Sequence, residues 1–99
     1  MLQIDGVTLD ARNDQVTGPS GTHHLTRMER RLLQVLMLHP GQVVPRAHLM
    51  ESVWQTTYLE DMRTLEVHVC LLRKKIEADP KNPRHLRTVR GVGYVFLTD

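Results

Sequence analysis

One amphipathic segment, residues 62–76, constrains the fold more than any other part of the sequence. At about 100° per residue, one side of a helix formed by this segment is uniformly apolar. That stripe consists of Leu65, Val69, Leu72 and Ile76. Steps of four, three and four residues are typical of a helix that buries one side, so the segment is predicted to be a helix that packs against a hydrophobic core.

The opposite side of this helix begins and ends with cations and is uncharged between them. Its residues are Arg63, Val67, Cys70, Leu71 and Lys74, with Arg73 on one flank and His68 and Lys75 on the other. Such a face suits a polyanion that has apolar groups between two charged edges. The major groove of DNA has phosphates on both edges and thymine methyl groups on its floor, which makes it such a surface.

Length and composition limit the class of protein. With 99 residues, of which 40% are hydrophobic, the chain has the size of one domain, which we expect to span residues 1–99. Cys70 is the only cysteine, which excludes an internal disulfide and favours a reducing, cytoplasmic location. The longest apolar run is far shorter than the roughly 20 residues of a membrane span, and the start of the chain lacks the pattern of an export signal.

Charge is distributed unevenly along the chain. Residues 1–62 contain five Lys or Arg and seven Asp or Glu, whereas residues 63–99 contain eight and four. This concentration of cations favours a polyanionic partner. A solvated basic face would give the same pattern, so the charge alone does not decide between the two.

The N-terminal quarter of the chain has the pattern of short strands. Apolar and polar residues alternate over residues 2–4, 7–10, 15–17 and 22–25. Turn-forming sequences separate them, including Asp5-Gly6 and Gly18-Pro19-Ser20-Gly21. We therefore expect a small antiparallel sheet that serves as a platform for helices.

A helix is predicted over residues 27–38. Thr26 and Glu29 match the capping box, in which each side chain satisfies a backbone amide of the other residue at the helix start. The residues predicted to be buried by this helix are Met28, Leu32, Val35 and Leu36. The sequence His39-Pro40-Gly41 is expected to end it.

A second helix is predicted from near Arg46 to near Trp54, with Leu49, Met50 and Val53 facing inward. Residues 55–61 have no clear period and are interpreted as a loop, from which Asp61 could cap the third helix.

The C-terminal part has the pattern of a hairpin. Asp79-Pro80-Lys81-Asn82-Pro83 ends the third helix, because proline cannot continue it. Two β-rich runs then flank Gly91-Val92-Gly93 within residues 86–97. Arg90 lies at the expected tip of this hairpin, where its side chain could reach outward.

This order of elements and four sequence motifs together resemble the effector domain of OmpR/PhoB-type response regulators. The motifs are Leu25-Thr26-x-x-Glu29-x-x-Leu32-Leu33, His39-Pro40-Gly41, Asp61-x-x-Thr64-Leu65-Glu66-Val67-His68-Val69-x-x-Leu72-Arg73-Lys74-Lys75-Ile76 and Thr88-Val89-Arg90-Gly91-Val92-Gly93-Tyr94. The resemblance covers nearly the whole chain. It implies an α+β winged helix-turn-helix fold, with an N-terminal four-stranded antiparallel sheet, three helices and a C-terminal β-hairpin wing. It also implies sequence-specific binding of double-stranded DNA and regulation of transcription, as the output domain of a two-component system.

The resemblance also implies which residues meet DNA. The recognition helix, about 62–77, would enter the major groove, and the wing, about 86–97, would reach the minor groove. Matched by position, the DNA-binding residues are Arg63, Thr64, Val67, His68, Cys70, Leu71, Arg73, Lys74, Thr88 and Arg90. Three alternatives stay open: His68 only flanks the core, Leu71 packs against the domain's own loops, and Arg90 is a plain turn cation.

Further partners follow from the same resemblance. The loop that family members use to touch RNA polymerase matches Gln55, Thr56, Thr57, Tyr58, Leu59 and Glu60. Family members usually carry an N-terminal receiver domain, which is absent from this sequence. We expect an isolated domain to be monomeric and to pair as a homodimer on tandem DNA half-sites.

Two departures from the family pattern affect these expectations. Cys70 and Leu71 occupy positions where several members have arginine or another polar residue, so a base preference cannot be carried over. Pro45 replaces the serine or threonine often found before the second helix, so we expect a less well-capped helix start.

Two other classes of function compete with DNA binding. A winged-helix protein-interaction module would use the apolar Val67, Cys70 and Leu71 for docking, although Arg90 beside two glycines argues against it. An enzyme is disfavoured because the sequence has no nucleophile with a matching base, no paired carboxylates and no phosphate-binding loop. The histidines lack metal-ligand spacing, so no metal and no cofactor is expected.

Overall fold

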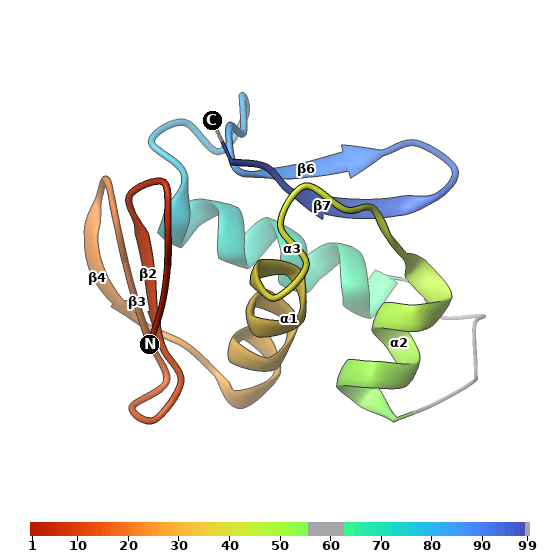
Figure 1. Cartoon of the computed structure of the whole chain (residues 1–99), viewed down its shortest axis with the longest axis horizontal. Helices are drawn as coiled ribbons and strands as arrows, with labels where there is room; N and C mark the ends of the chain where they lie inside the picture. The colour runs from red at the N-terminus through yellow and green to blue at the C-terminus, as the bar shows by residue number, and fades with distance from the viewer. Residues whose placement is uncertain (56–62, 99) are drawn as a thin grey trace.

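The computed structural model describes residues 1–55 and 63–98, which form two sheets and three helices (Figure 1). In chain order the elements are β1 (Leu2–Ile4), β2 (Val7–Asp10), β3 (Gln15–Gly18), β4 (Gly21–His24), α1 (Arg27–Met37), β5 (Val44–Pro45), α2 (Arg46–Trp54), α3 (Arg63–Ile76), β6 (Leu86–Val89) and β7 (Gly93–Phe96). The α+β winged helix-turn-helix fold predicted from the sequence is confirmed. No helix among the described residues has the length and apolar character needed to cross a bilayer.

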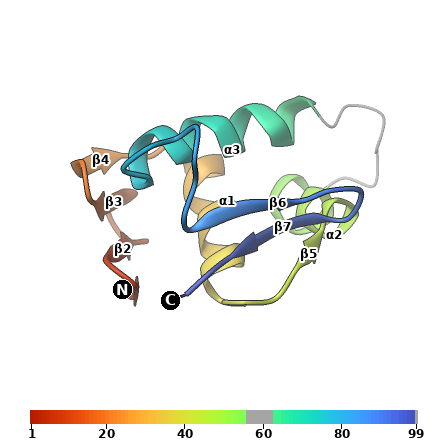
Figure 2. The same cartoon turned by 90° about the horizontal axis from the view of Figure 1, so that it is seen from above.

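The first sheet is antiparallel throughout, with strand order β1-β2-β3-β4. Asp5 and Gly6 form the first turn with positive φ angles of 46° and 82°. Alternation directs Val7, Leu9 and Val16 into the core. The sheet lies at one end of the domain, against the C-terminal end of α3 (Figure 2). The two elements are so close that an ideal Cβ built on Gly18 of β3 would lie 3.2 Å from the carbonyl oxygen of Ile76 in α3. This contact seats the C-terminal end of α3 on the sheet.

Helix α1 begins with the predicted capping box. The Glu29 amide donates to Thr26 Oγ1 at 3.2 Å, and the Thr26 amide donates to Glu29 Oε1 at 2.7 Å. The predicted burial of Leu32 and Leu36 is confirmed, but Met28 and Val35 are only half-buried. Leu33 and Met37 are buried in addition. The difference arises because α1 packs between the first sheet and the other helices and so buries a broader side than one stripe (Figure 1).

The second sheet has order β5-β7-β6 and contains one strand that the sequence did not predict. β5 places Val44 opposite Tyr94 and Pro45 opposite Gly93. A strand of two residues has no alternating pattern, so this stretch looked like a connection. Pro45 then precedes α2 without a side-chain cap, as expected from the sequence.

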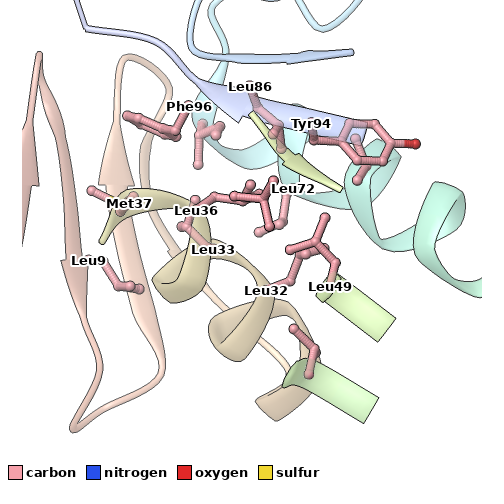
Figure 3. Close-up of a cluster of buried hydrophobic side chains, with 14 of the residues drawn as sticks. Leu9, Leu32, Leu33, Leu36, Met37, Leu49, Leu72, Leu86, Tyr94 and Phe96 are labelled. Atoms are coloured by element: carbon pink, nitrogen blue, oxygen red, sulfur yellow. The ribbon is translucent and has the colours of Figure 1, made fainter. Parts of the chain in front are cut away.

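A single core joins both sheets and all three helices. Figure 3 shows side chains from six elements meeting around α1, namely Leu9, Leu32, Leu33, Leu36, Met37, Leu49, Leu72, Leu86, Tyr94 and Phe96. Because α3 contributes Leu72 and the hairpin contributes Leu86 and Phe96, the same core holds both the helix and the wing in place.

One ion pair at the rim of the core also fixes α3. Lys75 Nζ lies 2.9 Å from Oε1 of the buried Glu29 and donates to the His24 carbonyl oxygen at 2.8 Å. Burial acts to raise the pKa of the Glu29 carboxyl, but the Thr26 amide and the Lys75 ammonium outweigh it, and the pKa falls below its ordinary value. Lys75 therefore anchors the end of α3 to the start of α1.

Candidate nucleic-acid interface

Helix α3 has one buried and one exposed side, as its periodicity predicted. Leu65, Val69, Leu72 and Ile76 are all buried. The exposed residues of the opposite side are Arg63, Glu66, Val67, Cys70, Leu71 and Lys74. We call this exposed side, defined by these six residues, the α3 face.

The centre of the α3 face is apolar. Val67 is 54% exposed and Leu71 is 38% exposed, and the free thiol of Cys70 is exposed as well. Leu71 therefore keeps more than a third of its surface open to solvent. Large apolar side chains left uncovered between cations commonly mark a binding surface.

His68 lies on the flank of α3 that faces α2. Its Nδ1 donates to the Thr64 carbonyl oxygen at 2.7 Å, and its ring meets Trp54 edge to face, with 5.1 Å between ring centroids. A carbonyl oxygen only accepts, so Nδ1 carries a proton and Nε2 of the neutral ring is an acceptor. A phosphate contact through Nε2 thus requires the charged imidazolium.

Arg73 lies on the other flank, next to the wing. Its Nε donates to the Leu86 carbonyl oxygen at 3.0 Å, and its Nη2 donates to Thr88 Oγ1 at 2.8 Å. Two of the residues predicted to touch DNA, Arg73 and Thr88, are therefore hydrogen-bonded to each other.

The wing consists of β6, β7 and the turn between them. Gly91 has a positive φ of 76°, which permits the tight turn, and Arg90 beside it is exposed. Val92 is 46% exposed, and its carbonyl oxygen accepts from the Arg46 amide at 3.1 Å. The wing tip is therefore tied to the start of α2.

Sequence reasoning missed two residues beside the α3 face, Arg46 and Tyr94, and one residue within it, Glu66. The Arg46 guanidinium carbon lies 5.9 Å from the centre of the Tyr94 ring, whose hydroxyl end points out of the core (Figure 3). Burial, the largest influence, raises the pKa of the Tyr94 phenol, and the Glu66 charge adds to that rise. Glu66 is itself exposed, so the α3 face is not free of negative charge between its cations. Helical geometry could have shown this, because Glu66 lies within about 40° of Cys70 around the helix.

The loop predicted to touch RNA polymerase is described only at its first residue. Gln55 ends α2 in a left-handed conformation with φ 56° and ψ 40°. Thr56, Thr57, Tyr58, Leu59 and Glu60 lie outside the described residues. The same is true of Asp61 and its predicted role as a helix cap.

Within the part of the chain that the structure describes, no three His, Cys, Asp or Glu side chains form a group suited to a metal. The buried His85 is bonded to protein oxygens, with Nδ1 at 3.0 Å from Glu77 Oε1 and Nε2 at 3.0 Å from the Asp5 carbonyl oxygen. This arrangement joins the first turn of the chain to the end of α3 and is structural.

Comparison with known proteins places the chain in a family. Residues 20–96 match the family described as "Transcriptional regulatory protein, C terminal". Over 94 residues, or 95% of the chain, it is 56% identical to the sensory transduction protein RegX3 of Mycobacterium leprae and 45% identical to RegX3 of Mycobacterium tuberculosis H37Rv. These matches span 48% and 41% of the two relatives, so the chain covers less than half of their length.

A solved structure gives the same result. The Klebsiella pneumoniae RstA DNA-binding domain in complex with the RstA box is 29% identical and superposes with a TM-score of 0.83, covering 96% of this chain and 94% of that one. The superposed region therefore includes nearly all of both chains. The chain thus belongs to the family of C-terminal DNA-binding effector domains of OmpR/PhoB-type response regulators.

Proposed function

We propose that α3 binds in the major groove of double-stranded DNA while the wing reaches the neighbouring minor groove. The observation that carries this proposal is the α3 face, where uncovered Val67 and Leu71 lie between Arg63 and Lys74. A cationic rim with an apolar centre complements phosphate edges around thymine methyl groups. The similar RstA domain, which is bound to its DNA box, supports the same use of the fold.

Each proposed contact follows from the position of its residue. Arg63, His68 and Arg73 lie at the rims of α3, where phosphates would pass, and Thr64 is a further proposed contact on this helix. Val67, Cys70, Leu71 and Lys74 lie nearest the bases. Thr88 and Arg90 are the wing contacts, and the exposed Arg90 can enter a narrow A·T-rich minor groove, which concentrates negative potential.

Affinity for duplex DNA is expected to fall steeply with salt. About four or five cation–phosphate contacts release counterions with a log-log slope of roughly −4. Doubling the salt concentration should thus weaken binding about 16-fold. Fluorescence anisotropy with a labelled duplex at several salt concentrations measures the slope, and Arg63→Ala should make it shallower by about one unit.

The same titration tests the main alternative. A winged-helix module that docks proteins through Val67 and Leu71 would show a slope near zero and no saturable binding to duplex DNA. That outcome would remove the proposed function and leave the α3 face as a protein-docking surface.

The apolar centre of the α3 face should read thymine methyl groups. Val67 and Leu71 have no side-chain donor for guanine, but contact with a C5-methyl group removes apolar surface from water and is worth roughly 1 kcal/mol or less. Uracil in place of the contacted thymine should therefore weaken wild-type binding up to about fivefold. The Leu71→Ala variant should not respond to this change at the base that Leu71 contacts. If no single uracil substitution in the binding site alters wild-type affinity, methyl readout is wrong.

The chain spans less than half of the length of its RegX3 relatives, and its wider role is a proposal. We propose that this protein is a cytoplasmic response regulator in which a receiver domain controls the present domain. The domain alone would be monomeric and would pair on tandem half-sites, with residues 55–60 facing RNA polymerase. Sedimentation without DNA and footprinting on selected sites test the pairing, since a stable free dimer or palindromic half-sites would contradict it.

A further inference from the structure

The side chain of Arg73 connects α3 to the wing through two hydrogen bonds. Arg73 leaves α3 on the wing side and donates to two acceptors of the same strand, the Leu86 carbonyl oxygen at 3.0 Å and Thr88 Oγ1 at 2.8 Å. Both acceptors belong to one short stretch of β6, since the main-chain oxygen of Leu86 and the hydroxyl of Thr88 are only two residues apart. A planar guanidinium with its donors in a fixed fork matches such a pair of acceptors and defines the angle between the elements it joins.

The strand bonded to Arg73 has different neighbours on its two sides. β6 is an edge strand, because the sheet order is β5-β7-β6. On its inner side it pairs with β7, through Thr88 opposite Tyr94 and Val89 opposite Gly93. On its outer side, Arg73 supplies hydrogen bonds from α3, and Glu77, directly after α3, accepts from the Leu86 amide at 2.8 Å. Figure 2 shows β6 running beside α3 towards its turn with β7. Arg90 directly follows β6, so the position of Arg90 relative to α3 follows that of the strand.

We infer that Arg73 is a positioning residue that sets the spacing between the recognition helix and the wing. The inference rests on the proposed function, because the spacing matters only if α3 and the wing touch DNA together. A hairpin that moves freely relative to α3 would lose conformational entropy when both elements bind DNA. A rigid connection between the two elements avoids this cost. A fixed distance also means that the A·T-rich tract read by Arg90 must lie a set number of base pairs from the sequence read by α3.

The role of Arg73 as a positioning residue differs measurably from its role as a phosphate contact. A phosphate contact contributes the same affinity wherever the A·T-rich tract lies. A positioning residue instead makes affinity depend on the location of that tract. Thr88 separates the two roles, because Thr88→Val removes the oxygen that accepts from Nη2 while leaving the charge of Arg73 unchanged.

The experiment uses a series of duplexes. Each carries one half-site, selected from random DNA, and a short A·T-rich tract moved in steps of one base pair within a G·C-rich flank. Wild-type affinity should peak at one spacing, about tenfold above the neighbouring spacings, which is the discrimination typical of a single good interaction with a base edge. In Thr88→Val and in Arg73→Lys, whose single ammonium cannot bridge both acceptors, the peak should flatten to about twofold or less. Circular dichroism verifies that each variant is folded.

Two controls make the result decisive. Thr88→Ser keeps the hydroxyl acceptor and should keep the wild-type spacing preference. In an Arg90→Ala background the spacing preference should already be absent, and Thr88→Val should introduce none, so that any loss of the Thr88 contact itself lowers affinity equally at all spacings. An equal loss of affinity at all spacings in Thr88→Val or Arg73→Lys would overturn the inference, as would a wild-type protein that binds DNA without a spacing preference. Absence of salt-dependent DNA binding by the wild type would instead overturn the proposed function.

Discussion

Replacing Gly93 with alanine should lower the free energy of unfolding by about 3 kcal/mol or more. An ideal Cβ on this residue would overlap the carbonyl oxygen of Val44 and lie 2.9 Å from the Cα of Pro45. Both are backbone atoms of β5, which pairs with β7, so they cannot rotate away as a side chain could. The strands would have to separate and expose part of the core around Tyr94. Urea denaturation followed by circular dichroism measures the loss.

Gly91→Ala is the matched control in the same hairpin. A Cβ on Gly91 would meet nothing within 4 Å, but the φ of 76° is unfavourable for alanine. The expected cost is therefore only the backbone strain of about 1–2 kcal/mol. If Gly93→Ala were no more harmful than Gly91→Ala, the close approach of β5 to β7 would not be a constraint on the fold.

The helices were predictable because each has a local signature. Thr26 and Glu29 are three residues apart, so the capping box can be recognised without knowing the rest of the fold. All four residues of α3 that the sequence predicted to be buried are buried, because this helix packs a single side against the core. The predicted set of buried residues of α1 lacked Leu33 and Met37. These two residues are buried because α1 packs against the first sheet as well as the other helices, which the sequence of the helix alone does not show.

For the candidate interface, the sequence predicted which side chains of α3 are exposed but not how α3 is bonded to the wing. Exposure of Val67 and Leu71 follows from helical geometry once the buried stripe is known. The pairing of Arg73 with Thr88 does not, because it joins residues of different elements whose distance is set by the packing of Leu72, Leu86 and Phe96. The strand β5 was missed for the same reason, since its partner β7 lies about fifty residues further along the chain.

A second large effect is expected at the end of α3, where Glu77→Ala should cost about 3–5 kcal/mol. Glu77 is only 2% exposed, and its carboxylate accepts hydrogen bonds from the loop that follows α3. Its Oε1 accepts from the Arg84 amide at 3.0 Å, and its Oε2 accepts from the Leu86 amide at 2.8 Å. The His85 amide and Nδ1 also lie within 3.1 Å of the carboxylate. Alanine would leave these donors buried and unpaired, each at a cost of about 1–3 kcal/mol if it cannot reach water.

Two further variants show whether this cost comes from the carboxylate. Glu66→Ala changes an exposed glutamate of α3, the helix that Glu77 directly follows, and should alter stability by no more than about 0.5 kcal/mol. Glu77→Gln keeps one oxygen acceptor but turns an amide NH₂ group towards backbone donors, so its cost should fall between those of the two alanine variants. Thermal or urea unfolding ranks the three. If Glu77→Ala were as mild as Glu66→Ala, the bonds to the loop would contribute little, and the position of β6 beside α3 would depend on Arg73 and the core alone.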